Sequence, residues 1–191
     1  MTELPKPTAI LNHEHLAIKS VLTTILKIAE AVEKYRLVDQ SLLADVTTFL
    51  QTFTVQCQQA QEEELLFPLL AAKCVTPSAC FIAGLAWEHR RAQFLASDLV
   101  ENISGYVLGG GAHPERLVTS LRDLAVLYQQ HLWKEEHILL PMADRLLSTA
   151  DQKALLEAFG RLTSEVELAD LAAGIELQLA HPPSHLGQIL I

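Results

Sequence analysis

Apolar residues recur every three or four positions along four long stretches of the chain, which is the pattern of helices that bury one face. We expect these helices to begin after Pro7-Thr8, at Ser41 as an N-cap, at Pro77-Ser78 and near Leu117, and the first to run to about Tyr35. The inner positions are, in chain order, Leu11, His15, Ile18, Leu22, Ile25, Ala29, Val32; Val46, Leu50, Phe53, Glu62, Leu65, Leu69; Ile82, Leu85, His89, Ala92, Ala96, Leu99, Ile103; and Leu117, Leu121, Leu124, Tyr128, His131, Glu135, Ile138, Met142. Four long helices with short connections predict an all-α fold, an antiparallel up-down four-helix bundle.

The remaining segments complete the predicted organisation. The glycine-rich stretch from Gly105 to Glu115 predicts a loop, and Pro141 predicts a kink or break in the fourth helix. Thr149 to Gln152 resembles a capping box that starts a short fifth helix through about Phe159. We therefore expect an N-terminal extension over residues 1–8 and one bundle domain over 9–160. A C-terminal tail over 161–191 should pack on the bundle or be partly disordered.

Polar residues interrupt the inner stripes, and they do so twice in the same way. The stretch Gln58–Pro68 (QQAQEEELLFP) aligns with His131–Pro141 (HLWKEEHILLP) at an offset of 73, so that Glu62 falls on Glu135. A second duplication, offset by 74, pairs Glu14-His15 with Glu88-His89. The chain thus reads as two helix pairs, each offering a lone histidine on its first helix and a glutamate on its second.

Buried histidines and carboxylates are costly unless they are hydrogen-bonded, neutralised or coordinated to a metal. A single core histidine is more often a packing residue than a ligand, but coincidence on four stripes favours a metal site. Imidazole and carboxylate ligands suit iron, manganese or zinc. A ferritin-like di-iron site is disfavoured, because none of the eight histidines has a glutamate three residues before it.

The amino-acid composition argues against some classes of binding partner and indicates the cellular compartment. The 191 residues include 14 basic and 23 acidic ones, and a net charge of −9 argues against nucleic acid or an anionic membrane as a partner. The chain has neither an apolar signal region at its start nor an apolar run long enough to span a membrane. Its three cysteines show no ligand-like spacing, and we expect a reduced, cytoplasmic protein.

Four motifs resemble those of hemerythrin-like proteins with an HHE cation-binding domain. They are EHLAI at Glu14–Ile18, QEEELLFP at Gln61–Pro68, EHRRA at Glu88–Ala92 and HLWKEEHILLP at His131–Pro141, and the resemblance covers roughly Ala9 to Leu147. It implies an oxo- or hydroxo-bridged di-iron centre in a hemerythrin-like bundle. The implied ligands are His15, Glu62, His89, His131 and Glu135, with the two glutamates as bridges.

Gln58 departs from the family pattern, because it stands where the family has a histidine on the second helix. A neutral amide is a poor iron ligand, so the site could keep two ions with one open position, or hold only one iron. The resemblance implies a non-haem iron protein that binds or senses oxygen, nitric oxide or peroxide, or that handles iron, more as a metal-binding or sensor protein than an enzyme. The alternative is a bundle with a degenerate site that acts as a regulatory or protein-interaction module.

Overall fold

The computed structural model describes residues 5–35, 37–73, 76–107, 114–162, 174–175 and 188–190. Its α-helices are α1 (Pro7–Tyr35), α2 (Gln40–Phe49), α3 (Phe67–Lys73), α4 (Thr76–Val107), α5 (Pro114–Lys134), α6 (Leu140–Leu146) and α7 (Thr149–Leu162). Wider π-helical turns, η1 (Leu50–Gln58) and η2 (Gln61–Leu66), lie between α2 and α3, and η3 (Glu135–Leu139) lies between α5 and α6.

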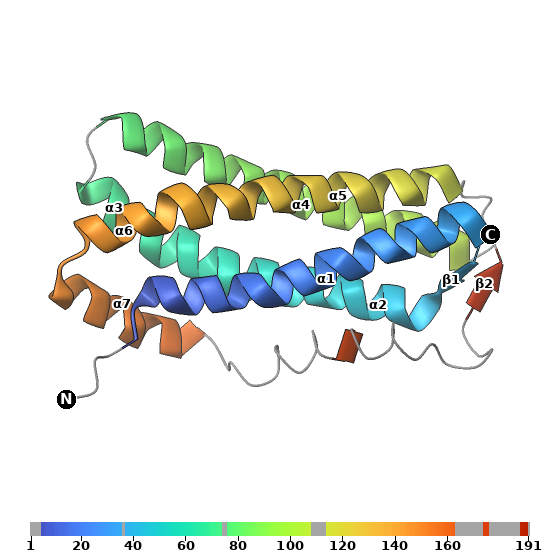
Figure 1. The fold of residues 1–191 in the computed structure, drawn as a ribbon, viewed down its shortest axis with the longest axis horizontal. Coiled ribbons are helices and arrows are strands. Elements are labelled where there is room, and N and C mark those ends of the chain that lie inside the picture. Colours follow the sequence, from blue (N-terminus) through green and yellow to red (C-terminus); the bar gives the residue numbers. More distant parts are fainter. Residues whose placement is uncertain are drawn as a thin grey trace.

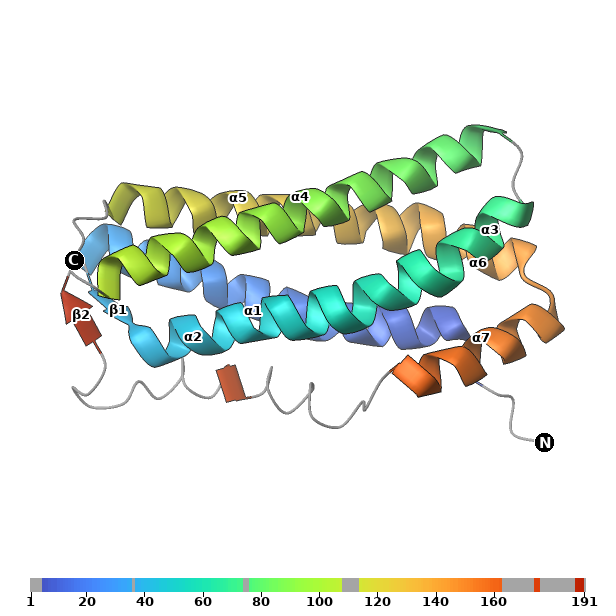
Figure 2. The same ribbon diagram turned by 180° about the vertical axis from the view of Figure 1, so that it is seen from behind.

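The long helices lie side by side along the long axis of the molecule (Figures 1 and 2). Helix α1 packs on α5, α5 packs on α4, and α4 contacts both α2 and η1. Helix α7 covers the end of the bundle where α1 begins. The predicted helical fold is confirmed at this level. Among the described residues, no helix has the length and apolar character needed to cross a membrane.

A pair of three-residue strands, which the sequence did not predict, closes the opposite end of the bundle. Strand β1 (Leu37–Asp39) pairs antiparallel with β2 (Gln188–Leu190), and Val38 lies opposite Ile189. Ile175, also from the C-terminal tail, is fully buried in the core. Segments this short carry no periodic pattern, so only the folded chain reveals their pairing. Most of the tail, residues 163–173, 176–187 and 191, lies outside the described residues, as do residues 1–4.

Several helix ends differ by a few residues from the prediction. Helix α1 begins at Pro7 itself, because proline is tolerated at the first helical position, where its missing N–H would have no partner. Helices α2 and α4 begin at Gln40 and Thr76, one residue before the expected starts. Both ends of the predicted loop are helical, since α4 continues to Val107 and α5 begins at Pro114; the rest of that prediction, residues 108–113, lies outside the description.

Helix α7 begins where the fifth helix was expected, but its cap is displaced by one residue. The Ser148 hydroxyl accepts a hydrogen bond from the Asp151 N–H at 3.2 Å, and Asp151 accepts one from the Ser148 N–H at 2.8 Å. This reciprocal pair is a capping box built on Ser148 rather than Thr149. Lys73 at the end of α3 lies 2.8 Å from the same Asp151 carboxylate and joins α7 to the bundle.

Apart from Phe53, whose side chain lies outside the description, the predicted inner faces hold as far as Glu62 in η2 and Glu135 in η3 and shift after these two residues. Leu65 and Leu69 are only partly buried, and Ile138 is 40% exposed. From the last residue of η2 and of η3 onward, the buried residues are instead Leu66, Phe67, Leu70, Leu139, Leu140 and Ala143. A π turn contains more residues than an α turn, so the buried face after it moves along the sequence by about one residue.

The apolar core consists of two clusters separated by a polar layer. One includes Ile18, Leu50, Ala92 and Leu132, and extends toward the strand pair. The other includes Leu11, Leu66, Leu85 and Leu139, and extends under α7. On each long helix the polar inner residues fall between members of the two clusters, as His15 does between Leu11 and Ile18. The fold therefore places these polar residues at one level of the bundle.

Candidate metal centre

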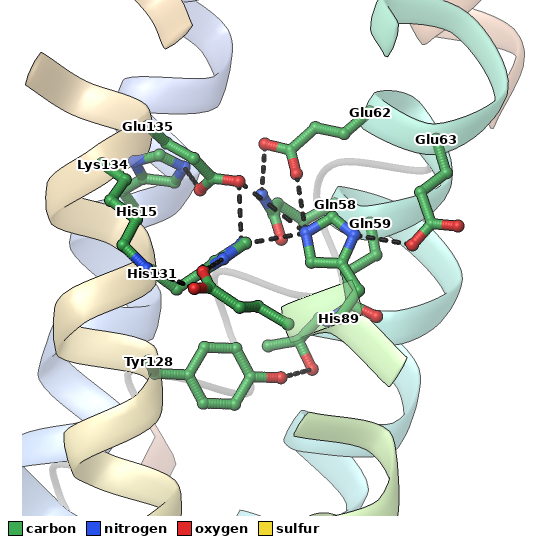
Figure 3. A network of polar contacts seen from close by, with 12 residues as sticks. His15, Gln58, Gln59, Glu62, Glu63, His89, Tyr128, His131, Lys134 and Glu135 are labelled. Carbon is green, nitrogen blue, oxygen red and sulfur yellow. Dashed lines mark hydrogen bonds and ion pairs between the residues drawn. The ribbon is translucent and has the colours of Figure 1, made fainter. Parts of the chain in front are cut away.

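The five predicted ligands come together in the polar layer. His15 projects from α1, Glu62 from η2, His89 from α4, His131 from α5 and Glu135 from η3 (Figure 3). Their side chains converge although 120 residues separate the first from the last along the chain. None of the five is more than 3% exposed. The structure thus brings all five together in the bundle interior.

Glu62, His89, His131 and Glu135 form the tightest group, in which one ligand atom from each residue lies within 4.8 Å of all the others. His89 Nε2 is 3.2 Å from Glu62 Oε2, and His131 Nε2 is 2.8 Å from Glu135 Oε1. His15 approaches from the other side, with its Nε2 3.3 Å from Glu135 Oε2. The geometry is that of a four-residue cluster with a fifth residue beside it.

Each of the three histidines is held from behind by a carboxylate on another helical segment. The distances are 3.3 Å from His15 Nδ1 to Glu136, 2.7 Å from His89 Nδ1 to Glu63, and 3.0 Å from His131 Nδ1 to Glu88. A carboxylate accepts the Nδ1 proton, which leaves Nε2 as the nitrogen that can offer a lone pair to the interior. This is the arrangement by which outer carboxylates orient histidine ligands of metals.

The inner atoms need a cation or a proton among them. His89 Nε2 and His131 Nε2 face each other at 2.9 Å, and two lone pairs that close would repel. His15 Nε2, Glu62 Oε2 and both oxygens of Glu135 are buried without a well-formed hydrogen bond. Such atoms are costly to bury, and coordination of a metal ion would satisfy them. The donor set therefore fits a metal ion.

A family model for the hemerythrin HHE cation binding domain matches residues 6–143. The chain belongs to the hemerythrin HHE family. Searches of curated proteins and of solved structures found no match. The resemblance read from the four motifs is confirmed, and the buried cluster could hold the cation for which the domain is named.

Electrostatic interactions in the centre of this HHE domain raise the pKa values of His89, His131 and Glu62, which favours their protonated forms when no metal ion is bound. Burial alone would lower the pKa of His89 and His131, but the adjacent carboxylates outweigh it and raise these pKa values to about 11 and about 9. Burial and the charge of Glu135 raise the pKa of Glu62 to about 7. Burial opposes ionisation of Glu135 as well, but the three surrounding imidazoles hold its pKa well below the usual value. An arriving metal ion must displace these protons.

Glu62 and Glu135 lie in matching π turns, η2 and η3. Each of these turns is followed by a proline two residues after its last residue. The backbone N–H of Phe67 bonds to the carbonyl of Glu62, and that of Leu140 bonds to the carbonyl of Glu135, both five residues back. Pro68 and Pro141 would clash with the preceding α turn, and the wider turns relieve that crowding. The break or kink expected at Pro141 therefore takes the form of a widened turn, and the helix resumes as α6.

The three outer carboxylates, Glu63, Glu88 and Glu136, were not predicted from the sequence. A signal for them existed, because each belongs to a duplicated Glu-Glu or Glu-His pair. Their helices face one another only in the folded bundle, so the sequence did not show which histidine each would hold. Further polar residues line the layer: Gln58 and Gln61 are at most 1% exposed, and Tyr128 donates a hydrogen bond to Thr54 at 3.1 Å. Burial raises the pKa of Tyr128 to about 12, so its hydroxyl stays protonated.

Proposed function

We propose that this hemerythrin-family protein holds iron in the polar layer and uses it to bind or sense a small ligand, or to handle iron. The ligand would be oxygen, nitric oxide or peroxide. The observation that carries the proposal is the set of inward imidazole nitrogens, each backed by a carboxylate, facing carboxylate oxygens that lack hydrogen bonds. Iron bound there would supply an open coordination position and a change of oxidation state.

The chain's own residues determine how such an ion is held. Glu62 and Glu135 contribute negative charge to a site that excludes water, which strengthens every charge interaction within it. Glu63 and Glu88 fix the rings of His89 and His131, so that the nitrogens stay aimed at the interior. Mixed nitrogen and oxygen donors favour iron, and would also accept manganese or zinc. We propose that the helices around this site form the antiparallel up-down bundle expected for the family.

A surface hollow supports access by a small ligand. It has a volume of about 300 Å³ and is lined by Lys19, Leu22, Thr23, Gln129, Trp133 and Glu136. Glu136 is also the carboxylate that contacts His15 at 3.3 Å, and Lys19 binds the same carboxylate at 2.5 Å. The hollow therefore ends one side chain away from the polar layer, at a residue whose ion pair could open without unfolding a helix.

The experiment is the metal content of protein purified without chelators and of protein reconstituted with Fe²⁺ under anaerobic conditions. We expect bound iron in both samples and a visible or near-ultraviolet absorption that changes when oxygen, nitric oxide or peroxide is added. Protein that binds none of iron, manganese or zinc would contradict the proposal. That result would favour the alternative of a bundle with a degenerate site, which the presence of Gln58 in place of a histidine also supports.

A further inference from the structure

The contacts around the centre repeat where the sequence repeats. The polar layer therefore has two related halves, one with His15, Gln58 and Glu62 and the other with His89, His131 and Glu135, and their contacts can be compared atom by atom. Under the offsets of 73 and 74, His15 corresponds to His89 and Glu136 corresponds to Glu63. Both pairs make the same contact, Nδ1 to Oε1, at 3.3 Å and 2.7 Å. The duplicated motifs thus produce an approximate twofold repetition of the outer contacts, and each deviation from it is informative.

The repetition extends to a third outer carboxylate. Glu88 binds both His131 and Lys134, which lie one turn apart on α5. Its counterpart is Glu14, which is 8% exposed and accepts a hydrogen bond at 3.3 Å from Gln61, the counterpart of Lys134. Glu14 therefore occupies the place of a carboxylate that would orient a histidine at position 58.

Position 58 is where the halves differ. Gln58 Nε2 lies 2.6 Å from Glu62 Oε1, just as His131 Nε2 lies 2.8 Å from Glu135 Oε1. The Gln58 nitrogen thus takes the place of the imidazole nitrogen, but an amide NH₂ has only protons to offer and no lone pair for a metal. It donates a hydrogen bond to the carboxylate oxygen that would otherwise be available to a second ion.

We propose that the protein binds a single metal ion, in the half formed by His89 and His131, and that Gln58 closes the other half by hydrogen-bonding Glu62. Glu14 then occupies the outer position from which a carboxylate would orient a histidine at position 58. The inference rests on the proposed metal binding and specifies its stoichiometry and location. His15 is the remaining imidazole of the closed half, where it pairs with Glu135 and Glu136.

The test is anaerobic titration of the metal-free protein with Fe²⁺ and with Co²⁺, followed by calorimetry and by metal analysis after gel filtration. Wild type should bind one ion per chain, and Gln58→His should bind two. In the double variant Gln58→His/Glu14→Gln, the second ion should bind roughly 10–100-fold more weakly, the loss typical of an outer carboxylate. The matched control is Gln59→His, a change at the adjacent glutamine, which is 2% exposed and bonded to Gln93; it should still bind one ion.

Each result decides a different point. Two ions in wild type would overturn the inference while leaving the proposed metal binding intact, whereas no ion in wild type would overturn both. One ion in folded Gln58→His would show that residue 58 does not close the second half. If Gln58→His does not fold, Gln58→Glu replaces the amide by a carboxylate of nearly the same shape, and it too should bind two ions. If neither variant folds, the number of metal ions bound per wild-type chain alone decides whether the inference holds.

Discussion

Replacing Glu62 by alanine is the sharpest test of the centre, because the chain supplies a matched control two residues away. Glu62 is fully buried, with one oxygen 2.6 Å from Gln58 and the other 3.2 Å from His89. Glu64 belongs to the same acidic run but is exposed. The variants Glu62→Ala and Glu64→Ala therefore remove the same formal charge from the same part of the helix, and only one of them removes a candidate ligand.

The expected effect follows from the position of the carboxylate. Loss of an outer carboxylate typically weakens metal binding by roughly 10–100-fold, and loss of a ligand that carries charge should exceed that range. We expect Glu62→Ala to weaken metal binding more than about 100-fold, or roughly 2.8 kcal/mol at about 1.4 kcal/mol per tenfold. Glu64→Ala should change it less than about twofold, because exposed charges are screened by solvent and salt.

Competition with a chelator of known affinity gives the two dissociation constants under identical conditions. Circular dichroism of the metal-free variants checks that each remains helical, so that weak binding reflects the missing ligand. Wild-type affinity in folded Glu62→Ala would refute the assignment of Glu62. An equal loss in both variants would show that net charge alone governs binding.

Two further predictions concern stability. Removing the metal with a chelator should lower the melting temperature, because only the folded bundle assembles the ligands; free metal at 100 times the dissociation constant adds roughly 2.7 kcal/mol, or roughly 5–11 °C for a chain of this size. An unchanged melt would contradict this. The hydrogen bond from Lys73 and those from Ser148 lower the pKa of Asp151 to about 2, so its contribution should be present above about pH 4 and be lost as the pH falls toward 2. Asp151→Asn should lower the melting temperature more at pH 6 than at pH 2, and an equal decrease at both pH values would contradict the stabilising role of the Asp151 carboxylate.

The inward position of the polar residues could be predicted from the sequence, because their spacing follows the period of the helices that carry them. Leu11, His15 and Ile18 form one regular stripe, and all three are buried as predicted. The duplication that pairs Glu14-His15 with Glu88-His89 placed a histidine at corresponding positions on two inner stripes. The family resemblance then supplied the chemistry that joins them.

The remaining features depend on information that periodicity does not contain. The π turns at Glu62 and Glu135 move the buried face, so that Leu139 is buried where Ile138 was expected. Helix-to-helix register decides that Glu63 reaches His89 and that Glu88 reaches His131. The β1–β2 pairing joins segments about 150 residues apart with no pattern in either. Each of these is set by tertiary packing, which overrides local signals.

The division of the apolar core has a consequence for how the protein unfolds. In the part of the chain that the structure describes, the two clusters lie on opposite sides of a layer of buried polar and charged residues. Several buried polar atoms of this layer have no well-formed hydrogen bond, so the layer itself stabilises the contact between the clusters little. A metal ion in the layer would be held by residues flanked by both clusters, and so would tie their opening into one cooperative event. Without it, amide hydrogens beside the strand pair and those beside α7 would exchange with separate free energies. The metal centre would then couple the two apolar clusters, so that they unfold as a single cooperative unit.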